Sequence, residues 1–113
     1  MVWRIRDRAT FEALRRSDRR ARRGPITVTY TPLGDAPGAE ARVAYAVGKR
    51  VGGAVQRNRL RRRLRAIVAE VATGLAPGAY LVAAGPEASD TGFEELKRTV
   101  AAAMTSASGE RRA

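Results

Sequence analysis

The chain has 113 residues, of which 22 are Lys or Arg and 11 are Asp or Glu, giving a net charge of +11. Hydrophobic residues make up 44% of it, so length and composition fit one folded domain and exclude a wholly disordered chain. The sequence contains neither Cys nor His, which excludes disulfides, thiolate nucleophiles, the usual Cys/His zinc sites and histidine acid–base catalysis.

The positive charge is concentrated in the first part of the chain. Residues 1–70 carry 18 basic and 6 acidic side chains, whereas residues 71–113 carry 4 basic and 5 acidic ones. All but two of the cations are Arg, whose planar guanidinium binds phosphate oxygens in a fork and stacks on bases. A field of one sign on part of a small domain indicates a polyanionic partner.

The first predicted element is a helix with Thr10 as its N-cap and with Phe11 and Leu14 on one face. The basic run Arg15–Arg23 then leads to a Gly-Pro pair, which ends any helix. Ile26–Thr31 alternates apolar and polar residues with period two, as is typical of a half-buried strand.

A second alternating strand is expected at Arg42–Val47, after a loop rich in turn formers at Pro32–Gly38. Because only this loop separates the two strands, they are predicted to form an antiparallel pair. A long helix over Ala54–Thr73 follows, with its apolar residues in one stripe at helical spacing. The stripe consists of Leu60, Leu64, Ile67, Val68 and Val71.

The remaining predicted elements are one strand and one helix. Tyr80–Ala84 is short and wholly apolar, which favours a central strand, and Gly92–Met104 has the spacing of a helix capped by Asp90 or Thr91. The fold class is therefore α+β, a single-domain α/β sandwich with a mainly antiparallel sheet and about three helices. We expect the domain to span residues 1–104 and residues 105–113 to form a frayed tail.

The segment Lys49–Arg65 is the most informative part of the sequence. Eight of its 17 residues are Lys or Arg, and no acid occurs on the predicted helix before Glu70. Most of these cations lie away from the apolar stripe, where neighbours three and four positions apart repel one another. A solvated helix face normally alternates charge signs, so this face indicates a polyanion that neutralises it.

Residues 48–65, GKRVGGAVQRNRLRRRLR, resemble the signature of the protein subunit of bacterial ribonuclease P. Residues 57–59 match the family's Arg-Asn-Arg core, and residues 49–50 match its basic pair. Gly48 stands where Ser or Ala is usual. Supporting similarity extends from about residue 4 to residue 103.

This resemblance implies a ribonucleoprotein enzyme whose protein binds a large catalytic RNA and precursor tRNA. The holoenzyme hydrolyses the precursor to remove the 5′ leader and leave the mature tRNA 5′ end. In that family the catalyst is the RNA with bound Mg²⁺, so no catalytic residue, metal ligand or tightly bound cofactor is expected on this chain. The family's basic helix makes an unusual left-handed crossover between two parallel strands of an α/β sandwich.

The resemblance also implies two RNA-binding surfaces. The surface facing the catalytic RNA consists of Lys49, Arg50, Arg57, Asn58, Arg59, Arg61, Arg62 and Arg65. The surface for the single-stranded leader, a cleft between the first helix and the sheet, consists of Phe11, Arg15, Thr27 and Thr29. Arg15 replaces an aromatic residue common in the family, and a guanidinium plane can also stack on a base. Whether Phe11 and Trp3 are core residues or stacking surfaces is left open.

Other classes of protein explain the sequence less well. A ribosomal or other structural RNA-binding protein has a similar charge profile and is the main alternative. A DNA-binding module is disfavoured because no helix-turn-helix spacing precedes the basic helix and no dimerising heptad follows it. A stand-alone enzyme is the weakest option because catalytic side chains are missing. With no long apolar run and no signal-peptide pattern, we expect a cytoplasmic protein that binds neither membrane nor DNA.

Overall fold

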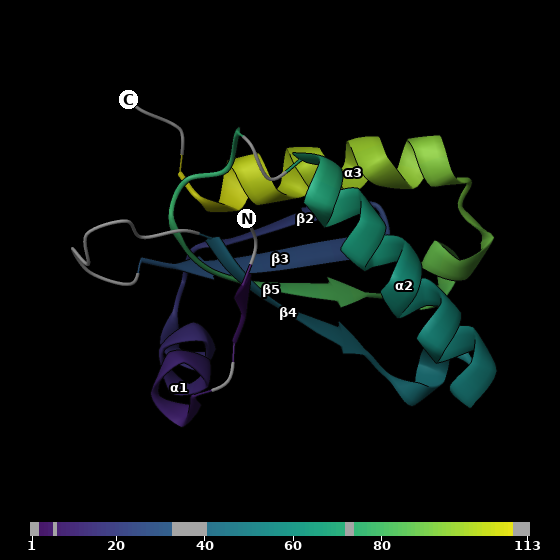
Figure 1. Ribbon diagram of the computed structural model, residues 1–113, viewed down its shortest axis with the longest axis horizontal. Helices are drawn as coiled ribbons and strands as arrows, with labels where there is room; N and C mark the ends of the chain where they lie inside the picture. Colours follow the sequence, from purple (N-terminus) through teal and green to yellow (C-terminus); the bar gives the residue numbers. More distant parts are fainter. Residues whose placement is uncertain (1–2, 6, 33–40, 72–73, 110–113) are drawn as a thin grey trace.

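The computed structural model describes residues 3–5, 7–32, 41–71 and 74–109, which form an α+β fold (Figure 1). The strands are β1 (Trp3–Arg4), β2 (Arg20–Arg23), β3 (Ile26–Thr31), β4 (Ala41–Val47) and β5 (Gly78–Ala84). The α-helices are α1 (Arg8–Arg16), α2 (Ala54–Val71) and α3 (Phe93–Ala107), and the short 3₁₀ helices are η1 (Lys49–Val51) and η3 (Pro86–Asp90). The predicted fold class is confirmed. Three features of the prediction lie outside the described part: the loop after Pro32, the last two residues of the long helix and the Trp3 side chain.

The strands form one sheet in the order β1-β4-β5-β3-β2, with the wholly apolar strand β5 at its centre as predicted. Strand β3 pairs antiparallel with β5 and β2, whereas β4 pairs parallel with β5 and β1. The predicted antiparallel pairing of Ile26–Thr31 with Arg42–Val47 is therefore wrong. Strand β5 lies between these two strands because it is apolar on both faces and gains most from having neighbours on both edges. The sheet is mixed, where a mainly antiparallel one was expected.

The sequence pattern does not predict strand β2, because a run of arginines shows no apolar alternation. Within Arg20–Arg23 only Ala21 is buried, and the strand pairs residue by residue with β3. Gly24, at φ 53°, and Pro25 form the two-residue turn between the strands. Glycine adopts this left-handed conformation without the steric cost that a side chain would bring.

Strands β4 and β5 are adjacent and parallel, and the chain passes between them through α2. In Figure 1 both strands run to the right, β4 lies below β5, and α2 crosses in front of the sheet. This connection is left-handed, as the family resemblance implies, and it departs from the right-handed rule for such crossovers.

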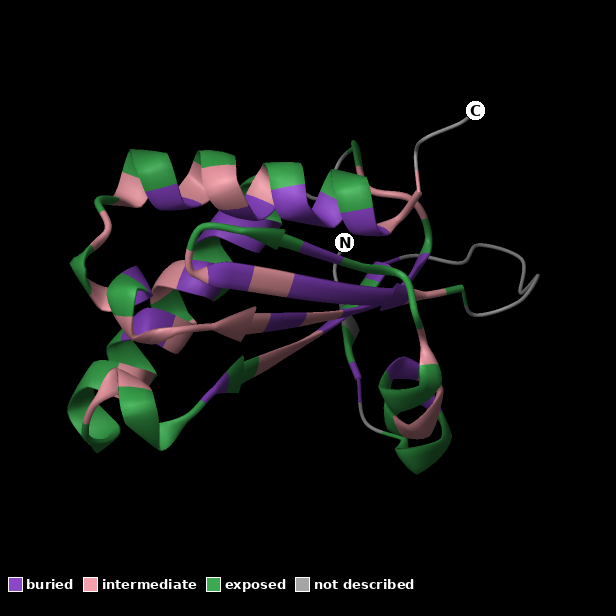
Figure 2. Cartoon of the chain, turned by 180° about the vertical axis from the view of Figure 1, so that it is seen from behind, coloured by how far each residue is buried: buried purple, intermediate pink, exposed green. Residues whose placement is uncertain are grey.

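Helices cover both faces of the sheet. The face that carries Tyr80 and Val82 packs against α2 and α3 in the main core. The opposite face packs against α1 through Leu14, which shares a smaller cluster with Ala79 and half-buried Leu81. Figure 2 shows the buried side of α3 turned toward the sheet and its outer side exposed. None of the helices in the described part is long and apolar enough to cross a membrane.

The N-terminus of α1 differs from the prediction. The helix begins at Arg8, and its N-cap is Asp7, whose Oδ2 accepts a hydrogen bond from the Thr10 backbone N–H at 3.0 Å. Thr10, the predicted cap, is the third helical residue and donates its hydroxyl proton to the Asp7 carboxylate. These bonds lower the pKa of Asp7 below its ordinary value, and the side-chain bond from Thr10 has a larger effect than the backbone bond. Asp and Thr are both common N-cap residues, so residue type alone does not choose between them. The hydrogen bond from the Thr10 backbone N–H to the Asp7 carboxylate identifies Asp7 as the cap.

Helix α3 also differs at both ends. Its N-cap is Gly92, which has no side-chain hydrogen bond, and neither Asp90 nor Thr91 caps it. The helix continues three residues past its predicted end because Ala107 is buried against the core, as are Ala103 and Met104. The small, polar residues after Met104 gave no sign of this burial in the sequence.

Gly78 is predicted to be intolerant of any side chain. It has φ 140°, and an added Cβ would lie 2.5 Å from the Tyr30 ring, whose hydroxyl donates to the Pro77 carbonyl at 2.6 Å. We expect Gly78→Ala to lower the free energy of unfolding by about 1–3 kcal/mol through this overpacking alone. Chemical denaturation measures the change. Gly48→Ala is the matched control, because Gly48 has φ −86° and no atom within 4 Å of the added Cβ. Equal stability of the two variants would contradict this packing.

Candidate nucleic-acid interface

Helix α2 buries its apolar stripe and turns its basic side outward. Leu64, Ile67 and Val68 have 0% exposure, and Leu60 has 1%, so the predicted stripe forms part of the main core. This packing fixes which side of the helix faces solvent. The structure places the eight residues expected to bind the catalytic RNA together, on η1 and on the first three turns of α2. Six are exposed, namely Lys49, Arg50, Asn58, Arg59, Arg62 and Arg65, and two are half-buried, namely Arg57 and Arg61.

The charges of this surface are not neutralised by the protein itself. Across the described residues the ion pairs are Arg15–Glu12, Lys97–Glu70 and Lys97–Glu94, and none of them involves η1 or the basic side of α2. Arginines three or four positions apart therefore repel one another on a folded helix. A ligand that brings negative charge to this face relieves that repulsion.

Two residues of the surface also hold one another in place. Asn58 Oδ1 accepts a hydrogen bond from Arg61 Nη1 at 2.9 Å, and Arg61 Nη2 donates to the carbonyl of Val47 at 3.5 Å. The bonds connect the beginning of α2 to the end of β4. Arg61 thus helps to hold the helix in place against the sheet, and Asn58 orients the Arg61 side chain.

Arg65 lies over a tyrosine ring of the sheet. Its guanidinium carbon is 5.9 Å from the centroid of Tyr45, a cation–π distance. Burial raises the pKa of Tyr45 to about 12, so its hydroxyl stays protonated throughout the physiological range. The contact holds the Arg65 side chain over β4, the strand that carries Tyr45.

The candidate leader surface is the sheet face beside α1. Thr27 and Thr29 pair with Ala83 and Leu81 of β5, on the face against which Leu14 of α1 packs. Thr27 is half-buried and Thr29 is buried. The structure therefore brings the threonines of β3 and the helix that carries Phe11 and Arg15 to one side of the sheet.

Phe11 is not a core residue. It is 39% exposed, whereas Leu14 on the same helix is 1% exposed and belongs to the smaller cluster. Arg15 is exposed as well and forms an ion pair with Glu12 at 3.4 Å. An accessible aromatic ring beside an accessible guanidinium is compatible with base stacking.

Two further cations of this face are not predicted by the sequence pattern. Arg20 pairs with Thr29 and Arg22 pairs with Thr27, so both arginines belong to the same sheet face as the threonines. Arg20 Nε donates to Thr29 Oγ1 at 3.4 Å. No sequence signal marks these two cations, because a single apolar residue between two arginines is too short an alternation to predict a strand.

Comparisons with known proteins agree with this geometry. The Ribonuclease P family model matches residues 2–108. The chain is 39% identical over 109 residues to the ribonuclease P protein component of Streptomyces bikiniensis, covering 89% of this chain and 88% of that protein. An RNase P protein mutant from Staphylococcus aureus superposes with a TM-score of 0.81 at 19% identity, covering 94% of this chain and 88% of that one. The RNase P protein from Thermotoga maritima superposes with a TM-score of 0.77 at 19% identity, covering 89% of this chain and 94% of that one.

The mixed sheet and its left-handed basic crossover define a class of small, cationic α/β-sandwich proteins. Identity to the two solved structures is only 19%, so these two comparisons show a shared fold and nothing further. The family model, however, spans nearly the whole chain, and the Streptomyces relative matches across most of both proteins. The chain belongs to the ribonuclease P protein family, which confirms the resemblance found in residues 48–65.

Proposed function

We propose that the chain is the protein component of a ribonuclease P holoenzyme that removes the 5′ leader from precursor tRNA. The observation that carries this proposal is the unneutralised cationic surface on η1 and α2, held outward because Leu60, Leu64, Ile67 and Val68 are buried on the other side of the helix. A duplex or folded RNA presents a dense array of phosphates, and guanidinium groups bind such oxygens in a fork. The catalytic RNA is the proposed partner of this surface.

The second proposed partner is the single-stranded leader of precursor tRNA. A single strand is bound by a cationic track combined with stacking platforms. The sheet face beside α1 offers the exposed ring of Phe11 and the cations Arg15, Arg20 and Arg22. Half-buried Thr27 belongs to the same face and has a hydroxyl suited to sugar and phosphate oxygens, whereas buried Thr29 accepts a hydrogen bond from Arg20 and supports that cation.

The proposed contribution of the protein is binding, with Mg²⁺ held by the RNA subunit. Among the described residues no three His, Cys, Asp or Glu side chains come close enough to hold a metal ion. Neutralising phosphates with arginine lowers the repulsion within the folded RNA and between RNA and substrate. The holoenzyme therefore needs less Mg²⁺ to reach its active structure than the RNA alone.

Reconstitution tests the holoenzyme function directly. The chain is mixed with a bacterial ribonuclease P RNA and a precursor tRNA, and 5′ cleavage is measured at a low Mg²⁺ concentration. We expect the protein to stimulate cleavage at the mature 5′ end. Binding of the RNA without any stimulation would identify a structural RNA-binding protein instead and would contradict the proposal.

Arginine substitutions on α2 are expected to weaken assembly with the catalytic RNA. Each of Arg59→Ala and Arg62→Ala removes a phosphate contact, so the slope of log affinity against log salt should decrease by about one unit. Binding titrations over a range of salt concentrations measure that slope. Arg98→Ala on α3 is the matched control, because Arg98 is exposed, carries the same charge and lies outside both surfaces. Equal effects of all three substitutions would show that net charge alone is responsible.

Phe11→Ala is expected to weaken binding of precursor tRNA only when a leader is present. Loss of one stacking platform reduces affinity by about 1–3 kcal/mol per stacked base. Assembly with the catalytic RNA and binding of mature tRNA should stay unchanged. Fluorescence titration with leader-bearing and leaderless tRNA makes the comparison. Leu14→Ala on the same helix is the control for folding and should cost about 2–5 kcal/mol of stability, because Leu14 is buried. A Phe11 variant as unstable as this control, with no leader-dependent difference, would contradict the assignment.

A further inference from the structure

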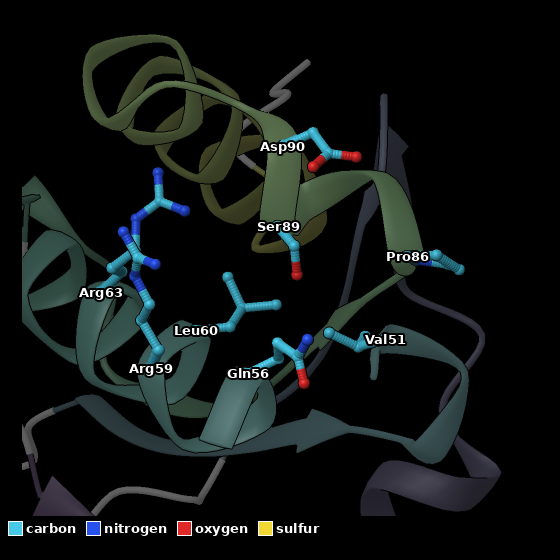
Figure 3. Close-up of a pocket in the computed structure, with 8 residues that line it drawn as sticks. All are labelled: Val51, Gln56, Arg59, Leu60, Arg63, Pro86, Ser89 and Asp90. Carbon is cyan, nitrogen blue, oxygen red and sulfur yellow. The ribbon is translucent and has the colours of Figure 1, made fainter. Parts of the chain in front are cut away.

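A pocket of about 430 Å³ opens between α2 and η3, away from the sheet face assigned to the leader (Figure 3). Leu60, Val51 and Pro86 provide its apolar lining. This volume is within the range of small-molecule sites, but polar and charged residues form more of the wall here than is usual for such sites. The polar groups here come from opposite sides, arginines from α2 and a serine from η3.

The serine of this pocket has an unused hydrogen-bonding group. Ser89 Oγ is buried, and no group of the described residues serves as its hydrogen-bond partner. Figure 3 shows the hydroxyl directed into the space between η3 and the helix, across from the guanidinium groups of Arg59 and Arg63. A buried hydroxyl without a partner destabilises the protein, and it gains a bond when a ligand fills the space.

The charge of the pocket favours an anion. Arg63 Nη2 donates to the carbonyl of Thr91 at 2.5 Å, which holds this guanidinium in the wall and connects α2 to η3. Arg59 is exposed, and its side chain forms no hydrogen bond or ion pair with other described residues. Asp90 also borders the pocket, but it pairs with neither arginine, and Figure 3 shows its carboxylate turned away from both.

We propose that this pocket binds one unstacked nucleotide of an RNA strand. Its phosphate lies between Arg59, Arg63 and Ser89, because two guanidinium groups and a hydroxyl can all donate hydrogen bonds to an acceptor-only ligand. Its base lies against Val51 and Pro86, since single-stranded RNA is recognised through bases that leave the stack. The inference rests on the proposed function and extends the RNA surface from α2 to η3, a segment outside the residues assigned to RNA above.

Mononucleotide binding to the free protein tests the pocket without any large RNA. Isotopically labelled protein is titrated with adenosine 5′-monophosphate, inorganic phosphate or adenosine, and amide chemical shifts are followed by NMR. We expect the nucleotide to shift the amides of residues 51–60 and 87–91. It should bind at least about tenfold more tightly than inorganic phosphate, because contact with the base adds to the phosphate contact. Equal affinity for phosphate and nucleotide, or no shift in these segments, would overturn the proposal.

Variants separate this pocket from the general positive field. Ser89→Ala should weaken nucleotide binding by about ten- to hundredfold, the effect of one hydrogen bond to a charged group. Arg59→Ala should weaken it by more than about tenfold. Arg62→Ala is the matched control: it removes the same charge from the same helix but does not border the pocket, so nucleotide binding should change by less than about twofold. Equal losses in the two arginine variants would overturn the proposal.

The same variants distinguish failure of the pocket from failure of the proposed function. Both arginine substitutions weaken assembly with the catalytic RNA if α2 binds that RNA, whereas only Arg59→Ala weakens mononucleotide binding. If assembly depends on both arginines but no mononucleotide binds, the pocket proposal is overturned and the proposed function stands. If the nucleotide binds as expected but neither substitution affects assembly, the proposed function of α2 is overturned and the pocket stands.

Discussion

The burial of one stripe of α2 against the sheet is the interaction on which the rest of the structure depends. Leu60, Leu64, Ile67 and Val68 have at most 1% exposure. Burying each such side chain stabilises the fold by about 1.5–3 kcal/mol, whereas each like-charge pair on the opposite face costs about 0.2–0.5 kcal/mol. Packing therefore outweighs repulsion by a wide margin. The protein can present a row of unneutralised arginines on a folded helix because its other side is anchored so firmly.

The topology gives this helix its position relative to the sheet. Because α2 connects β4 to the central strand β5, the chain at both of its ends leads into adjacent, paired strands of the sheet. Two side-chain hydrogen bonds add to this attachment. Arg61 donates to the Val47 carbonyl at the end of β4, and Arg63 donates to the Thr91 carbonyl directly after η3. With α1 on the opposite face, the cationic helix and the open sheet face lie on different sides of one sheet. The two proposed RNA surfaces are thereby kept apart by the core.

Local patterns in the sequence predict most of the elements but not their arrangement. The period-two alternation of Ile26–Thr31 and the apolar stripe of α2 predict both elements, since each depends on neighbours along the chain. The place of β5 between β3 and β4 depends on long-range pairing, which no local pattern specifies. The basic face of α2 could be predicted because charge and apolar residues separate at helical spacing. Arg20 and Arg22 could not, because their strand is defined by pairing with β3, and Ser89 could not, because its neighbours come from another element.

The most direct test of this account is the thermal unfolding of the free protein at low ionic strength in the presence of different anions. If the arginines of α2 repel one another on a helix that packing holds folded, ligands that neutralise them bind the native state and raise its melting temperature. Sulfate and short oligonucleotides should therefore stabilise the protein more than chloride does at matched ionic strength. A melting temperature that is the same in chloride, sulfate and oligonucleotide would contradict a preformed cationic surface on this helix.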